Sequence, residues 1–99
     1  MRLPKNRPPT HPGELLLEEF LAPYKMSQKE LSERTNMSYP RINELVHGKR
    51  GITPDTALRL SKLFGTTAEF WLRGQLAYDL WHAMHSPQAK QIEAIEPIR

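Results

Sequence analysis

Apolar residues recur along the 99-residue chain in short stripes with helical spacing, and prolines, glycines and small polar residues separate the stripes. A first helix is expected to begin at Pro12, because the first helical turn has no use for the N–H group that proline lacks. Pro23 is expected to end this helix. Its apolar stripe consists of Leu16, Leu17, Phe20 and Leu21.

A capping box predicts the start of a second helix. Ser27 and Glu30 have the spacing at which each side chain satisfies a backbone N–H of the first turn, so the helix begins at Gln28 and runs to about Thr35. Asn36 follows, and asparagine tolerates the left-handed backbone of a tight turn. The pattern therefore predicts a helix that leads directly into a turn.

A third helix follows this turn at once. Ser38 caps it, Pro40 lies in its first turn and Gly48 ends it. Its inner face is apolar and consists of Ile42, Leu45 and Val46. Its outer face is mostly polar and consists of Pro40, Arg41, Asn43, Glu44 and His47. This polar face lies next to a basic loop that begins at Lys49.

Two more helices complete the pattern. Thr53 and Pro54 open a fourth helix that Gly65 closes, and its buried stripe is Ala57, Leu60, Leu63 and Phe64. Thr66 and Glu69 have the spacing of another capping box. They start a fifth helix that reaches His82 or Met84.

The fifth helix is apolar most of the way round. Its apolar residues are Phe70, Trp71, Leu72, Leu76, Tyr78, Leu80 and Trp81. Such a helix needs a second surface to cover, and self-association is the simplest source of one. We therefore expect a homodimer whose interface consists of Leu72, Leu76, Leu80 and Trp81.

The two ends of the chain lie outside this helical pattern. Residues 1–11 are rich in proline and predict an extended arm. Residues 85–99 form a tail that carries Ile92, Ile95 and Ile98, and its pattern leaves open a short helix, a strand paired with a partner copy or a disordered segment. The fold expected for residues 12–84 is all-α, with five helices of which the last is long.

Charge is concentrated in one part of the chain. The formal net charge is only +3, but six basic residues face three acidic ones between Lys25 and Arg50, and Arg2, Lys5 and Arg7 are unopposed. A basic segment on a nearly neutral body indicates a surface that meets a polyanion.

Composition excludes several classes of protein. There is no cysteine, which rules out disulfides, thiolate catalysis and cysteine-bound zinc, and which fits a reducing cytoplasm. No apolar run is long enough for a signal peptide or a membrane span. We therefore expect a cytoplasmic protein.

Catalytic and metal sites are not expected either. Asp79 and His82 are the best acid–base pair available, and no serine is placed with them. His82 and His85 have the spacing of metal ligands on a helix, but no third ligand accompanies them. The aromatic residues that could stack on single-stranded bases are Trp71, Tyr78 and Trp81, and their position among leucines favours core and interface. No enzyme activity, cofactor or metal is therefore expected.

The second and third helices have the layout of a helix-turn-helix, in which the second helix of the pair enters the major groove of DNA. Arg41 could reach guanine, Glu44 could accept from cytosine, and Tyr39 lies at the groove end of the helix. The candidates for phosphate contact are Gln28, Lys29, Ser38, Asn43, Lys49 and Arg50. An ordinary helical hairpin would explain the caps and stripes equally well, but not the polar face beside a basic loop.

Long motifs resemble a known family. The order of Gln28, Leu31, Ser38, Ile42, Leu45 and Gly48-Lys49 resembles the phage-repressor-like (XRE) helix-turn-helix. Closer runs are similar to the HigA antitoxins of the virulence-associated protein I type: HPGELLLEEFL at 11–21, GKRGITPDTALRLSKLFGTTAEFWL at 48–72 and AYDLW at 77–81. Together they cover most of residues 10–82. Two positions depart from the wider repressor pattern: Ser32, where alanine is usual, and Asn36, where glycine is usual.

The resemblance implies a cytoplasmic antitoxin that dimerises, binds an operator in its own promoter and neutralises a HigB-type ribonuclease toxin. It places the base-contacting positions of the family at Tyr39, Pro40, Arg41 and Glu44. It places the family's contacts with the DNA backbone at Gln28, Ser38, Asn43 and Lys49. The alternatives are an XRE-type regulator without a toxin, a protein-interaction module that does not bind DNA specifically, and an RNA-binding protein.

Overall fold

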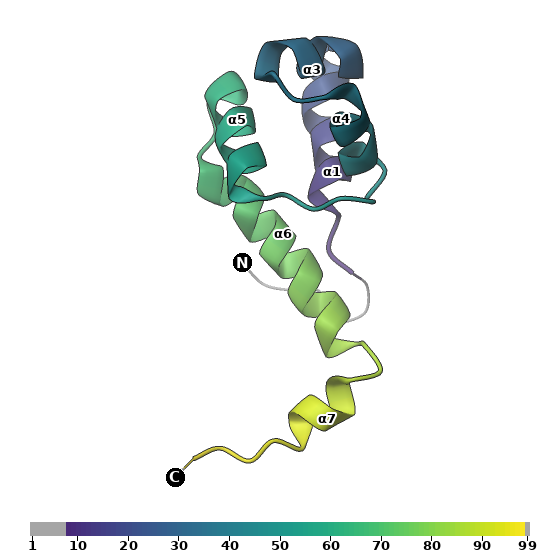
Figure 1. Cartoon of the computed structure of the whole chain (residues 1–99), viewed down its shortest axis with the longest axis vertical. Helices are drawn as coiled ribbons and strands as arrows, with labels where there is room; N and C mark the ends of the chain where they lie inside the picture. Colours follow the sequence, from purple (N-terminus) through teal and green to yellow (C-terminus); the bar gives the residue numbers. More distant parts are fainter. Residues whose placement is uncertain (1–7, 99) are drawn as a thin grey trace.

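The computed structural model describes residues 8–98, and every regular element in that range is a helix (Figure 1). Residues 1–7 of the predicted arm lie outside the described residues. The expected all-α fold is confirmed, with its five helices and one short addition in the tail. The elements are α1 (Pro12–Leu15), η1 (Leu16–Leu21), α2 (Ala22–Tyr24), α3 (Gln28–Thr35), α4 (Tyr39–Val46), α5 (Pro54–Phe64), α6 (Ala68–Met84) and α7 (Ala89–Glu93).

The first predicted helix is a single run that α1, η1 and α2 form together, and its middle part is π-helical. Ala22 N donates to Leu17 O, five residues back. Pro23 does not end the helix as expected, since α2 continues to Tyr24. The wider π turn before Pro23 accommodates a residue without an N–H. Leu17 is more exposed than its place in the predicted stripe implied.

Most predicted caps are confirmed, and one is wrong by a residue. The Ser27, Ser38 and Thr53 hydroxyls accept from backbone N–H groups at the starts of α3, α4 and α5. For α6 the cap is Thr67 and not Thr66. The Thr66 hydroxyl instead accepts from the indole N–H of a buried tryptophan of α6, Trp71, at 2.8 Å, and this bond fixes which of the two threonines faces the helix end.

The core lies where the first helical run, α3, α4, α5 and the start of α6 meet. Its fully buried large side chains are Leu16, Leu31, Ile42, Leu45, Leu60 and Trp71. Phe20 packs against Trp71 and Phe64, with ring centroids 5.0 and 4.9 Å apart. The apolar face of α4 is thus anchored inside the molecule, and the rest of α4 faces outward.

The second half of α6 extends beyond this core and leads to α7, which lies at the opposite end of the molecule from α3 and α5 (Figure 1). The molecule is accordingly elongated, with extents of 51 × 25 × 24 Å. The tail, for which the sequence left three possibilities open, forms the short helix α7. No helix among the described residues is long and apolar enough to cross a membrane.

Gly13 is the point of closest approach between α1 and α4. A Cβ atom at this position would lie 1.7 Å from the backbone oxygen of Leu45. We predict that Gly13→Ala lowers the free energy of unfolding by about 1–3 kcal/mol, because backbone has to move to make room. Gly74→Ala is the matched control. Its Cβ would meet Pro12 at an ordinary 3.6 Å, within α6, so alanine should leave stability unchanged or raise it slightly. Urea unfolding measures both, and equal effects would contradict this account.

His11 caps α1 as a neutral acceptor, since its Nδ1 accepts from Gly13 N at 2.9 Å. Burial lowers the pKa of His11 below 6.5, and the charges of Asp79 and Glu14 oppose this effect more weakly. The unfolded chain therefore binds more protons near and below pH 6.5, so the free energy of unfolding should fall as pH drops through 6.5.

His11→Asn keeps a capping acceptor and removes the titration. We predict a smaller change in the free energy of unfolding between pH 7.5 and 5.5 for this variant than for the wild type, measured by urea unfolding. The other histidines are common to both proteins and cancel in the comparison. An unchanged pH dependence would show that His11 is not responsible.

Candidate nucleic-acid interface

The turn between α3 and α4 is closed by its own side chains. Asn36 has a φ of 57°, the left-handed conformation expected for it. The Ser32 hydroxyl donates to the carbonyl oxygen of Met37, and Met37 N donates back to Ser32 O at 3.2 Å. A serine therefore has a structural use here, where alanine is usual in the wider pattern. The turn holds the two helices in a fixed relation.

Two of the predicted phosphate-contact residues, Gln28 and Asn43, meet between α3 and α4, and others lie near the starts of the two helices. Gln28, in the first turn of α3, accepts through Oε1 from Asn43 Nδ2 of α4 at 3.1 Å. The Ser38 hydroxyl accepts from Arg41 N at 3.3 Å at the start of α4. Lys29 is exposed on α3. The first N–H groups of α3 have no partner within the helix, which suits a phosphate group. In α4, Pro40 has no N–H and Arg41 N is bonded to Ser38, so its N-terminus offers fewer donors.

The predicted base-contact positions are only partly free. Tyr39 is 50% exposed and Pro40 is exposed beside it. Glu44 accepts two hydrogen bonds from Arg50, from Nε at 2.9 Å and from Nη2 at 2.8 Å. Lys49 is exposed, and none of the ion pairs among residues 8–98 involves it. The basic loop therefore folds back onto the outer face of α4.

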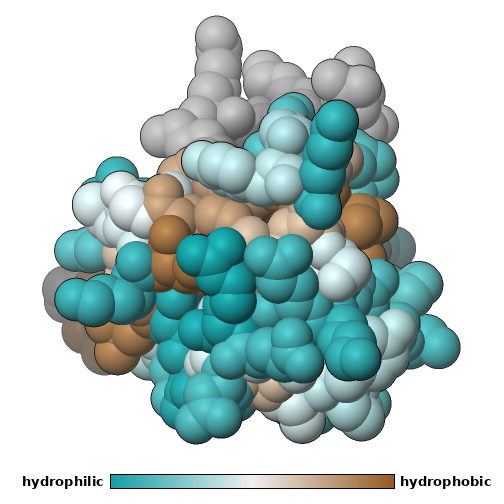
Figure 2. Space-filling view, turned by 90° about the horizontal axis from the view of Figure 1, so that it is seen from above, coloured by the Kyte–Doolittle hydropathy of each residue, from teal (hydrophilic) through white to brown (hydrophobic). Residues whose placement is uncertain are grey.

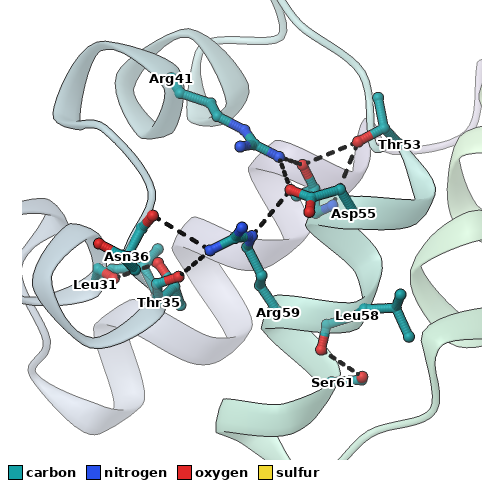
Figure 3. Close-up of polar contacts among 10 residues, drawn as sticks. Leu31, Thr35, Asn36, Arg41, Thr53, Asp55, Leu58, Arg59 and Ser61 are labelled. Carbon is teal, nitrogen blue, oxygen red and sulfur yellow. Dashed lines mark hydrogen bonds and ion pairs between the residues drawn. The ribbon is translucent and has the colours of Figure 1, made fainter.

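Arg41 points away from the turn and toward α5 (Figure 3). Its Nη2 donates to Asp55 Oδ2 and to Thr56 Oγ1, each at 2.6 Å. Asp55 Oδ2 also accepts from Arg59 Nε at 2.9 Å. Arg59 Nη1 in turn donates to the carbonyl oxygen of Thr35 at 2.9 Å. We call the four residues Arg41, Asp55, Thr56 and Arg59 the clamp, because they join the α3–α4 turn, α4 and α5.

The clamp perturbs one ionisation. Hydrogen bonds from Arg41, and then from Arg59, hold the pKa of Asp55 below its usual 3.8. Asp55 is therefore a carboxylate at neutral pH and binds both guanidinium groups. The contact of Arg41 with a base stays a prediction, and in the described structure its guanidinium is engaged with α5.

The sequence did not identify Asp55, Thr56 or Arg59 as parts of the site. Asp55 and Arg59 have the i, i+4 spacing of a helical ion pair, which could have drawn attention to them. Gln75 was missed as well. Its Oε1 accepts from Ile52 N at 2.7 Å and so ties the segment after the basic loop to α6. No local pattern predicts a contact across 23 residues.

The predicted dimer residues on α6 fall into two groups. Leu76 and Leu80 are 57% and 45% exposed. Leu72 is partly buried against the core of its own chain. Trp81 is half-buried and stacks on His85, and its indole N–H is buried with no acceptor among the described residues. The dimer interface remains a prediction, and Leu76 and Leu80 are its accessible members.

Hydrophilic surface is not confined to α4. Figure 2 looks down on the end of the molecule where α3 and α5 lie in Figure 1, and most of that face is hydrophilic too. Polarity alone therefore does not mark α4. The distinguishing features of α4 are exposed Tyr39 in its first turn, exposed Lys49 just after its last turn, and the bond between Asn43 and Gln28 at the N-terminus of α3. No group of three or more histidine and acidic residues in the described range could hold a metal ion.

A short helix, a closed turn and a second helix whose outer face is open define the helix-turn-helix class. The helix-turn-helix family matches residues 17–71. Virulence-associated protein I of Dichelobacter nodosus is 48% identical over 86% of this chain and 79% of that protein. Antitoxin HigA-1 of Vibrio cholerae is 34% identical over 99% of this chain and 90% of that protein.

A solved structure agrees with these relatives. The Pseudomonas aeruginosa antitoxin HigA with higBA promoter superimposes with a TM-score of 0.84 at 40% identity, over 92% of this chain and 99% of that one. The chain therefore belongs to the helix-turn-helix family that includes virulence-associated protein I and the HigA antitoxins. These relatives are helix-turn-helix proteins and antitoxins rather than enzymes.

Proposed function

We propose that this protein is a DNA-binding repressor and the antitoxin of a toxin–antitoxin pair. The observation that carries the proposal is the helix-turn-helix itself, with Gln28 at the N-terminus of α3 bonded to Asn43 of α4, Tyr39 exposed in the first turn of α4 and Lys49 exposed just after its last turn. The Pseudomonas aeruginosa relative with its promoter supports the same mode of binding. The protein would act in the cytoplasm on the promoter of its own operon.

Base reading is proposed for exposed Tyr39 and Pro40 and for Glu44, which can accept from cytosine once Arg50 turns to a phosphate. The residues proposed to contact phosphates, and so to position the protein on the DNA backbone, are Gln28, Lys29, Ser38, Asn43, Lys49 and Arg50. Arg41 belongs to the same face, and its role depends on the clamp.

A dimer would determine the spacing and symmetry of the operator that this surface binds. Each copy would insert α4, its recognition helix, into the major groove. Two such helices related by a two-fold axis read half-sites about 34 Å apart, one turn of DNA, so the operator should be a palindrome. The exposed leucines of α6, Leu76 and Leu80, supply the contact between the copies, together with Leu72 and Trp81.

The partner protein proposed is a HigB-type ribonuclease toxin, which the antitoxin neutralises. The similarity to antitoxin HigA-1 over 99% of this chain supports this part. Co-expression of the chain with the toxin of the adjacent gene should restore growth that the toxin alone arrests. A chain that binds its promoter but restores no growth would be a regulator without a toxin.

Fluorescence anisotropy with the promoter of its own operon tests DNA recognition. We expect tight binding to the promoter duplex at physiological salt, and binding at least about 1,000-fold weaker to a scrambled duplex. Equal binding to any sequence, seen only at low salt, would favour the protein-interaction module. Tighter retention of single-stranded RNA than of duplex DNA would favour an RNA-binding protein.

Lys49→Ala tests the phosphate surface. We predict weaker binding to all sequences alike, with the magnitude of the slope of log K against log salt reduced by about 0.9, because one phosphate contact is lost. Lys90→Ala is the matched control, since it removes the same charge from α7 at the far end of the molecule. If the two variants had the same slope of log K against log salt, Lys49 would not be a phosphate contact.

Leu80→Asp tests the dimer. The wild type should have the mass of two chains by light scattering at micromolar concentration, and the variant the mass of one, because a charge enters the apolar contact. Leu58→Asp on α5 is the control, since Leu58 is also exposed at 61% and is not in the predicted interface. A wild type with the mass of one chain would contradict the proposed dimer.

A further inference from the structure

The clamp bears on how the recognition helix reads DNA, because it engages the one arginine on that helix. Arg41 is the residue that the sequence assigned to guanine. Its side chain is only 24% exposed, and its Nη2 atom lies 2.6 Å from Asp55 Oδ2 and 2.6 Å from Thr56 Oγ1. Two acceptors at this distance are sufficient to engage both hydrogens of Nη2.

The geometry of a guanidinium explains why a bond to Nη2 prevents bidentate contact with a base. An arginine reads guanine with two parallel N–H groups, one to O6 and one to N7. The planar guanidinium offers two such pairs, Nη1 with Nη2 at its end and Nε with Nη2 at its side. Both pairs contain Nη2. While Asp55 and Thr56 hold that atom, Arg41 has no bidentate pair to offer a base.

Exchange of these partners for a base would replace a charged acceptor with a neutral one. Asp55 is a carboxylate, so both partners of its bond with Arg41 are charged, whereas a guanine edge is a neutral acceptor. Release of Arg41 would also leave Asp55, whose side chain is 54% exposed, beside the DNA phosphates with only Arg59 to balance its charge. The clamp should therefore stay closed when DNA binds.

We propose that Asp55 and Thr56 withhold Arg41 from base reading, and that Arg41 acts as a positioning residue that seats the recognition helix against α5. Arg59 extends the same contact to the turn, through the carbonyl oxygens of Thr35 and Asn36. The base preference of the operator then comes from the other exposed residues of α4. This inference rests on the proposed function.

The test is a panel of duplexes in which each base pair of the operator is replaced in turn, with dissociation constants measured by anisotropy. For Arg41→Ala we expect the same loss on every duplex, with no base pair losing its preference. Arg41→Lys should recover part of that loss, because an ammonium can still pair with Asp55. Arg34→Ala is the control, since the one ion pair of Arg34 within residues 8–98 is with Glu30 on α3.

Asp55→Ala gives the sharper result. Without Asp55, one hydrogen of Nη2 is released while Thr56 still binds the other, so Arg41 can offer one bidentate pair to guanine. This variant should therefore gain a preference for a G·C pair at one position, by roughly 5- to 150-fold. The double variant Asp55→Ala with Arg41→Ala should lose that gain. If Asp55→Ala does not fold by circular dichroism, Asp55→Asn removes the charge with little change of shape and is measured in its place.

The outcomes separate cleanly. Loss of preference at one base pair in Arg41→Ala would show that Arg41 already reads a base, and would overturn the inference. So would the lack of any new preference in a folded Asp55→Ala or Asp55→Asn variant. A wild type that does not distinguish the operator from a scrambled duplex would overturn the proposed function itself, and this inference with it.

Discussion

The position of α4 depends on how closely α1 approaches it. The backbone of Gly13 lies so near Leu45 O that no side chain fits between them. This approach lets Leu45 and Ile42 enter the core, where they are 1% and 0% exposed. Because the inner face of α4 is fixed in this way, its outer face has a defined direction. The first helical run thus determines which residues of α4 face outward.

On the outer face, charges are arranged in internal pairs. Arg41 pairs with Asp55, and Glu44 with Arg50. Such pairs near the surface add little to stability. Their larger effect is on geometry, since each fixes a long side chain that would otherwise lose conformational freedom when DNA binds. Because these charges are already paired, the outer face of α4 attracts polyanions in general less strongly than unpaired basic residues would.

The parts of the fold that were predicted from sequence are those that local chemistry decides. Ser27, Ser38 and Asn36 act on backbone groups within a few residues, so their positions in the sequence reveal their roles. The capping error at α6 has a tertiary cause, because the indole of Trp71 needs an acceptor and takes Thr66. The clamp has the same kind of cause: Arg41 and Asp55 are separated by 14 residues and by a loop. The outer face of α4 could be identified from its polarity, but the pairing of its charges could not.

The central claim is that the outer face of α4 and the N-terminus of α3 contact duplex DNA. The most direct measurement is the change in backbone amide chemical shifts in NMR spectra when a promoter duplex is added to the protein. The account predicts that the largest changes cluster at Gln28, at Ser38 to Glu44 and at Lys49 to Arg50. Changes confined to α7 and the exposed side of α6, with α3 and α4 unaffected, would contradict it.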